Sequence, residues 1–146
     1  MKKIILSALS VIGIAMAAHA QCDQTVQISS SKTNMLDATY QVKGSKDEQV
    51  VVDITKTTIT ITNNGKTEDA LTGQIKDMQC AWKVPFKEGK TVIQTDLVDR
   101  SGDVKEATIT IEGKEGKITL IAEAKERPDQ KIQLEVNKFE QKAESR

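Results

Sequence analysis

Apolar and polar residues alternate with a period of two along most of this chain, from about residue 35 to residue 139. This period places successive side chains on opposite faces of an extended strand, so it indicates sheets with one apolar face. Turn signals interrupt the alternation every ten to fourteen residues or so, and no segment shows the 3.6-residue period of a helix. We therefore predict an all-β fold of about nine to ten strands.

The predicted strands differ in how clearly their ends are marked. Asn63-Asn64-Gly65-Lys66 is a strong hairpin turn, because Asn and Gly tolerate positive φ. Residues 36–42 alternate as one strand, and a short strand is possible at residues 25–28. Lys76-Asp77 predicts a short turn, and Pro85, which lacks an N–H, predicts an edge or a bulge. The other apolar faces are Val50, Val52 and Ile54; Ile59 and Ile61; Leu71 and Ile75; Cys80, Trp82, Val84 and Phe86; Ile93 and Leu97; Ala107, Ile109 and Ile111; Ile118, Leu120 and Ala122; and Ile132, Leu134 and Val136.

The connections between these strands are too short for parallel crossovers, which need a dozen or more residues. Neighbouring strands must therefore be mostly antiparallel and linked by hairpins. An antiparallel meander with one apolar face closes into an up-and-down barrel or folds into a barrel-like two-layer sandwich. We predict one of these two architectures for a single β domain over residues 21–139, followed by a frayed polar tail over residues 140–146.

The first twenty residues differ in character from the rest. Lys2-Lys3 precede an apolar run, and Ala18-His19-Ala20 fits a cleavage site, so residues 1–20 read as a secretory signal peptide. Gln21 directly before Cys22 does not fit a lipoprotein signal. We predict a soluble bacterial product, exported to the periplasm or the outside, that begins at Gln21.

Cleavage changes the composition in an informative way. Removal of residues 1–20 lowers the number of basic residues from 21 to 19 against 21 acidic ones, so the net charge becomes −2. It also removes the single histidine. The mature chain has no strongly basic footprint for nucleic acid and no second apolar stretch that could span a bilayer. Ile, Val and Thr dominate the apolar and β-branched content, which favours strands.

Cys22 and Cys80 are the sharpest signal in the chain. An even number of cysteines in an exported protein predicts a disulfide, and this one would stabilise the fold by roughly 4 kcal/mol in the chain-entropy model. Pairing of Cys22 between two molecules is the alternative.

Other motifs favour structure over chemistry. The Gly-Lys-Thr tripeptides at residues 65–67 and 89–91 lack the earlier glycine of a phosphate loop. Residues 96–103 concentrate oxygen ligands but lack the acid spacing of a calcium loop, so they predict an Asp/Ser/Gly turn. With no histidine to activate either cysteine, we predict no catalytic residue, no metal site, no cofactor and no enzymatic activity.

The few aromatic residues have two interpretations. Trp82 and Phe86 share the face of Cys80, which predicts core packing around the disulfide. Alternatively, Tyr40, Trp82 and Phe86 form the wall of an apolar ligand pocket.

In strand count and length the chain resembles the calycin group, the small meander barrels that carry apolar ligands. The Gly-x-Trp of lipocalins is absent near the first strand, since the only tryptophan is Trp82. The resemblance implies a carrier that binds a small apolar ligand inside the barrel. The sequence itself gives slight preference to a non-enzymatic structural or protein-interaction module of the bacterial envelope. In that hypothesis residues 57–62, an uncharged strand, add to the edge of a partner protein. A cavity of a few hundred Å³ would favour the carrier, and a packed interior with an exposed edge strand would favour the interaction module.

Overall fold

The structure is a computed structural model that describes residues 20–142. The predicted signal peptide therefore lies outside the described residues, apart from Ala20. β8 extends to Gln141, two residues past the predicted end of the domain. In chain order the elements are η1 (Ala20–Asp23), β1 (Val26–Leu36), β2 (Val42–Ile54), β3 (Thr58–Asn63), η2 (Thr67–Asp69), β4 (Leu71–Val84), β5 (Glu88–Val98), β6 (Val104–Lys114), β7 (Lys117–Ala124) and β8 (Lys131–Gln141).

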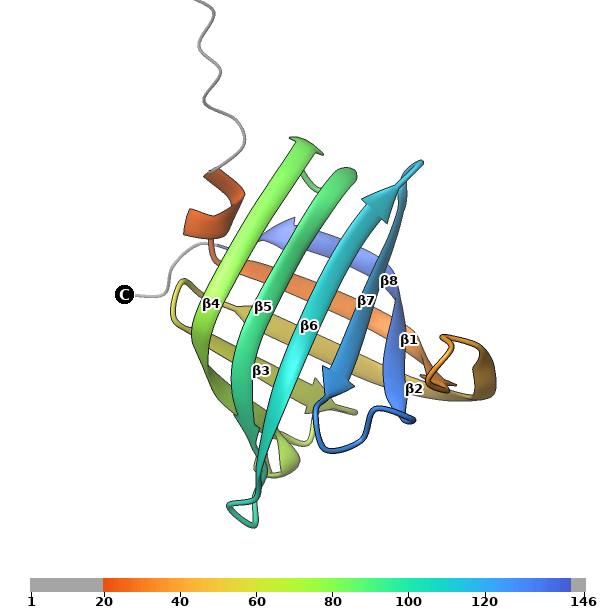
Figure 1. Cartoon of the computed structure of the whole chain (residues 1–146). Coiled ribbons are helices and arrows are strands. Elements are labelled where there is room, and N and C mark those ends of the chain that lie inside the picture. The colour runs from red at the N-terminus through yellow and green to blue at the C-terminus, as the bar shows by residue number, and fades with distance from the viewer. Residues whose placement is uncertain (1–19, 143–146) are drawn as a thin grey trace, which may run out of the picture.

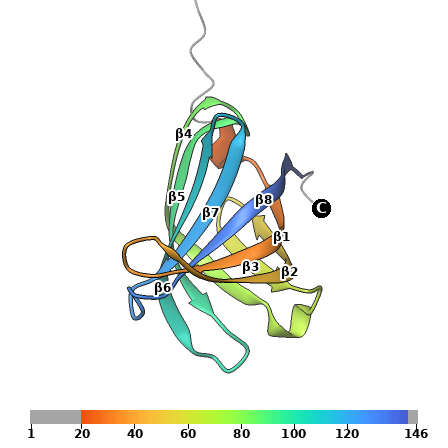
Figure 2. The same ribbon diagram turned by 90° about the vertical axis from the view of Figure 1, so that its right-hand side faces the viewer.

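The eight strands form one closed up-and-down barrel, which confirms the predicted fold class. Each strand pairs antiparallel with the next, and β8 pairs with β1 to close the barrel. β4 to β7 run side by side in one wall, and β8, β1, β2 and β3 cross behind them in the other (Figures 1 and 2). Of the two predicted architectures, the barrel is the one observed.

Alternate turns lie at opposite ends of this barrel. The disulfide end carries the turns at residues 55–57, 85–87 and 115–116. The cavity end carries the connections at residues 37–41, 64–70, 99–103 and 125–130.

Residues 36–42 do not form the predicted strand. Leu36 ends β1 and is buried, whereas Tyr40 and Val42 are exposed. Residues 37–41 between them are a hairpin turn, and Tyr40 has a φ of 65°. One carboxylate oxygen of Asp37 accepts hydrogen bonds from the N–H and hydroxyl of Thr39 and from the N–H of Gln41. This local bonding ends the alternation, because it favours a turn over an extended chain.

Lys76-Asp77 is not a turn either. β4 runs continuously through both residues, and the pairing with β5 shifts register between Ile75 and Asp77. Such a shift is a β-bulge, which adds a residue to one strand and bends it without ending it. Two predicted strands are therefore one. Because residues 36–42 are not a strand either, and the short strand predicted at residues 25–28 is the start of β1, the strand count is eight. Pro85 lies in the turn after β4, next to a second register shift between Trp82 and Val84.

The free edge predicted for residues 57–62 is not present. Residues 59–61 of β3 pair with β2 on one side and with β4 on the other. The Thr-rich face of this strand is an ordinary outward face of the barrel wall.

The apolar core lies inside the barrel, on the faces that the alternation predicted. Ile109, Ile118, Leu120 and Leu134 are all buried, as expected for the C-terminal strands. The other buried apolar residues are Val26, Ile28, Leu36, Val50, Val52, Ile54, Ile59, Trp82, Ile93, Leu97, Ala107 and Ile111.

Candidate functional site

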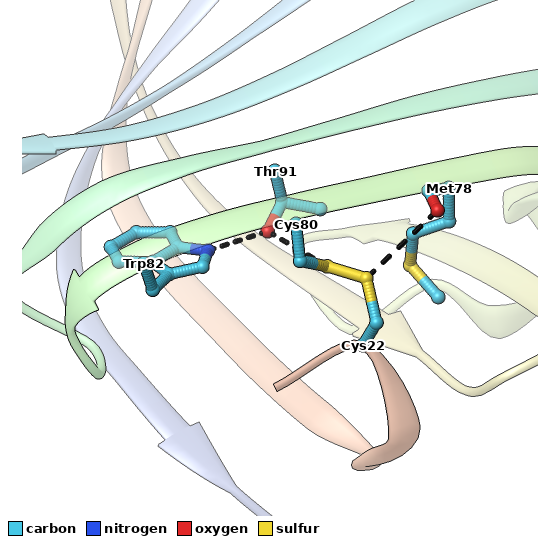
Figure 3. Close-up of a disulfide and its surroundings, with 5 residues drawn as sticks. All are labelled: Cys22, Met78, Cys80, Trp82 and Thr91. Atoms are coloured by element: carbon cyan, nitrogen blue, oxygen red, sulfur yellow. Dashed lines mark hydrogen bonds between the residues drawn. A yellow bond between two sulfur atoms is a disulfide. The ribbon is translucent and has the colours of Figure 1, made fainter. Parts of the chain in front are cut away.

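The predicted disulfide between Cys22 and Cys80 is present at the disulfide end. The two Cα atoms are 5.8 Å apart, which fits ordinary disulfide geometry. The bond links η1 to β4 (Figure 3), and the two elements lie side by side (Figure 1). It fixes a polar N-terminal segment that contributes little apolar surface of its own.

Aromatic side chains fill the barrel beside the disulfide. The ring centroid of Phe139 lies 5.6 Å from that of Trp82 and 4.8 Å from that of Phe86, both edge to face. The indole Nε1 of Trp82 donates to Thr91 Oγ1 at 2.7 Å (Figure 3). Gly89, opposite Trp82 on β5, leaves room for the indole, since a Cβ there would lie 2.8 Å from Trp82 Cδ2. The aromatic rings at this end of the barrel are therefore packed against one another, and the indole N–H has a hydrogen-bond partner.

Tyr40 lies elsewhere, in the turn between β1 and β2 at the cavity end, and it is 53 % exposed. The structure thus brings Trp82 and Phe86 together with Phe139, but not with Tyr40. None of the three residues proposed as an aromatic ligand wall lines the cavity described next.

A cavity of about 320 Å³ occupies the other half of the barrel. Its inner surface is formed mainly by aliphatic side chains from both walls, and its rim by residues of the turns at the cavity end. The apolar lining consists of Val50, Val52, Ile61, Leu71, Leu97, Ala107, Leu120, Ala122, Ala124, Ile132 and Leu134. The polar lining consists of Thr33, Glu48, Asn63, Asp99, Asp103, Lys105, Glu123, Arg127 and Gln130.

The cavity exists because the side chains that face it are short. Ala107, Ala122 and Ala124 stand at inward positions of β6 and β7, and no aromatic residue is among the lining residues. Interiors normally pack without voids much larger than a water molecule, so a space of this size in a small barrel is a distinct feature.

Glu48 places a carboxylate on the inner wall. Its side chain is only 9 % exposed, and it follows the same inward face of β2 as Val50 and Val52. One carboxylate oxygen lies 3.4 Å from the hydroxyl of Thr33, which donates to it, and the other lies 2.9 Å from Lys46 Nζ. A buried carboxylate with so few partners is well placed to bind a ligand.

Asp99 braces the rim between β5 and β6. The hydroxyl of Ser101 donates to the Asp99 carboxylate at 2.6 Å and lowers the pKa of that group. The N–H groups of Ser101 and Asp103 donate as well and lower the pKa further, against the opposing effect of burial. Arg100 forms an ion pair with Asp69 of η2, with 3.5 Å between Arg100 Nη1 and Asp69 Oδ1. The segment that concentrates oxygen ligands is thus a self-bonded turn, as predicted.

Glu123 joins the rim to the turn at residues 37–41. It accepts hydrogen bonds from Lys131 Nζ and from the Tyr40 hydroxyl, the latter at 2.8 Å. The Lys131 Nζ atom also lies 4.0 Å from the centre of the Tyr40 ring, in a cation–π arrangement. Burial raises the pKa of Glu123, but the hydrogen bonds from Lys131 and Tyr40 and the charge of Lys131 outweigh this, so the pKa is lowered.

Sequence reasoning missed Glu48, Thr33 and Glu123 as lining residues. Glu48 could have been found, because it is in phase with Val50, Val52 and Ile54 on the inward face of β2. Thr33 could not, because register shifts in β1 between Ser29 and Thr33 break the alternation before it.

Over residues 20–142, no group of three or more His, Cys, Asp or Glu side chains is close enough to hold a metal ion. Within the same residues, no helix has the length and apolar character needed to cross a membrane. No protein family, curated protein or solved structure matches this chain.

Proposed function

We propose that this protein binds a small, mostly apolar molecule in the cavity. The observation that carries the proposal is a space of about 320 Å³ with an aliphatic inner surface and a few polar groups. Ligand pockets have this composition and run from about 300 to 1,000 Å³, so the space suits a small ligand. An eight-stranded barrel is just wide enough to hold one.

The cavity reverses the order of the two hypotheses that the sequence suggested. The interaction module rested on a filled interior and on a free edge at residues 57–62. The interior is filled only at the disulfide end, and that edge is paired on both sides. A calycin-like carrier is therefore the better-supported function, and it is supported by the barrel and the cavity rather than by sequence motifs.

We include export and the absence of catalysis in the proposal. The disulfide supports export, because disulfides persist in oxidising compartments. Binding needs no activated nucleophile, and two of the rim carboxylates, Asp99 and Glu123, are already engaged in structural hydrogen bonds.

A protein-interaction role is the second candidate function, and it would use an edge of β4 instead of the strand at residues 57–62. Pairing of β3 with β4 ends at Gln74, so residues 76–84 of β4 pair with β5 alone among the described strands. Part of this edge lies beside η1 and the disulfide (Figure 1). An extended partner segment could add there through backbone hydrogen bonds.

Titration with 1-octanol, a neutral apolar probe, tests the proposed function. Two-dimensional NMR of the unmodified protein should show saturable shifts in amides of the strands around the cavity. Ala122→Phe should abolish them, because the ring fills the space. Ala81→Phe, on an exposed position of β4, is the matched control and should bind octanol normally. Shifts that persist in Ala122→Phe, or their absence from the unmodified protein, would contradict the proposal.

A further inference from the structure

Glu48 is the most enclosed ion-paired carboxylate of the cavity lining. Its side chain is 9 % exposed, whereas that of Glu123 is 27 % exposed. Glu123 is also occupied by Lys131, whose own side chain is 11 % exposed. The two carboxylates therefore differ, because only Glu123 has a buried cation as its partner.

Glu48 retains capacity to accept further hydrogen bonds. An ionised carboxylate offers about four acceptor sites. The Glu48 carboxylate accepts one long hydrogen bond, from Thr33 Oγ1 at 3.4 Å, and forms one ion pair, with Lys46 Nζ at 2.9 Å. The Lys46 side chain is 68 % exposed, so this ion pair is in contact with water and contributes little.

The cations of the cavity lining are at the rim, not beside Glu48. Lys105 and Arg127 are both exposed, and Arg127 donates to Gln130 at 3.0 Å. No ion pair joins either of them to Glu48 in the described part of the chain. A largely buried carboxylate in a mainly aliphatic cavity attracts a cation and repels an anion more strongly than one in water, because such surroundings screen charge poorly.

We propose that the ligand of this cavity is a small amphipathic amine. Its apolar body lies against Val52, Leu120 and Leu134, and its ammonium group donates to the Glu48 carboxylate. Thr33 orients the carboxylate from the neighbouring strand. This inference rests on the proposed function and deepens it, since it names the chemical class of the ligand.

An alkanoate is the opposing possibility. Its chain would enter the cavity and its carboxylate would stay at the rim beside Lys105 and Arg127. The lining argues against this arrangement, because the ligand would bring a further anion to a cavity that already carries the carboxylates of Glu48, Asp99, Asp103 and Glu123.

Three eight-carbon probes separate these outcomes: 1-octylamine, 1-octanol and octanoate, titrated by calorimetry at neutral pH. The amine and octanoate are kept below their micellar concentrations, and octanol is kept below its solubility limit. We expect the amine to bind about tenfold more tightly than the alcohol, as a charge-assisted hydrogen bond would give, and octanoate to bind most weakly. Glu48→Gln should remove the preference for the amine and leave octanol binding unchanged. Glu112→Gln makes the same charge change at an exposed, outward position and should alter nothing.

Octanoate that binds as tightly as the amine would overturn the inference, and so would an amine preference that survives Glu48→Gln. Either result leaves the proposed function standing if octanol binds. Failure of octanol to bind overturns the proposed function, and the inference with it. The ranking of the three probes on the unmodified protein tests the inference even if Glu48→Gln folds poorly.

Discussion

The two ends of this barrel are built from the same strands but packed in opposite ways. At the disulfide end, Trp82, Phe86 and Phe139 interlock and the Cys22–Cys80 bond fixes the N-terminal segment. At the cavity end, the inward positions are aliphatic and short, and a space of about 320 Å³ remains. Three of the four aromatic residues in the whole chain are thus concentrated at one end.

This difference shows how one sheet can hold a packed half and a hollow half. Aromatic side chains bury the most surface per residue, so one end can supply much of the packing energy. The other end then tolerates a hollow that would otherwise cost stability. The fourth aromatic residue, Tyr40, lies in a turn at the cavity end and bonds to the rim through Glu123.

Shortening a core side chain at each end gives the largest expected effects. Trp82→Ala should lower the free energy of unfolding by about 3–5 kcal/mol, because it leaves a large void in a packed cluster. Leu120→Ala at the cavity end should cost about 2–3 kcal/mol, since a hollow already adjoins that side chain and fewer contacts are lost. Urea denaturation measures both.

Thr110→Ala is the control for these two variants. Thr110 lies on the outward face of β6, so its loss should change stability by about 0.5 kcal/mol or less. A larger loss for Leu120→Ala than for Trp82→Ala would reverse the comparison between the two ends.

Removing the disulfide tests whether the two ends are independent. The double variant Cys22→Ser/Cys80→Ser should lose about 2–5 kcal/mol of stability, because the bond closes a long loop in the unfolded chain. Octanol affinity, measured well below the unfolding temperature, should stay the same, since neither cysteine is among the residues that line the cavity. A loss of octanol affinity together with the loss of stability would show that the cavity depends on the disulfide end.

The sequence predicted an antiparallel meander, closed as a barrel or folded as a two-layer sandwich, because alternation and hairpin signals dominate its strands. The sequence-based predictions were wrong where a local feature has the composition of a different one. Lys76 and Asp77 have the polar character of a turn but form a β-bulge, and so the single strand β4 resembles two strands in the sequence. Glu48 is a charged residue in phase with Val50, Val52 and Ile54, and this break in an otherwise apolar inward face is the sequence signal that could have marked it as part of a site. A cavity depends on the sizes of side chains that meet across the barrel, which no single strand reveals.

Two turns at the cavity end show the same limit. In residues 99–103, the positive φ of 88° falls on Gly102, three residues after the bracing Asp99, and the glycine made the turn recognisable. In residues 37–41, the equivalent position is Tyr40, with a φ of 65°. A tyrosine there resembles a strand residue, so the same turn was missed.

The smallest expected effect is the response of that second turn to acid. The hydroxyl of Thr39, followed by the N–H of Gln41, lowers the pKa of Asp37 from 3.8 to about 2. A lowered pKa means that the folded turn favours the charged form. Its stabilising contribution is therefore present above pH 3.8 and is lost as the pH falls through about 2.

Amide shifts of Thr39 and Gln41, followed by NMR from pH 5 to pH 1.5, should titrate with a midpoint of about 2. Asp37→Asn keeps an oxygen that can accept the same hydrogen bonds but cannot ionise, so it should hold the turn and abolish this titration. Amides near Trp82 at the disulfide end report whether the whole barrel changes instead. If they move together with Thr39, acid acts on global stability and the turn is not an independent unit. If they stay fixed while Thr39 and Gln41 titrate, the cavity end has a local pH response that the packed end lacks.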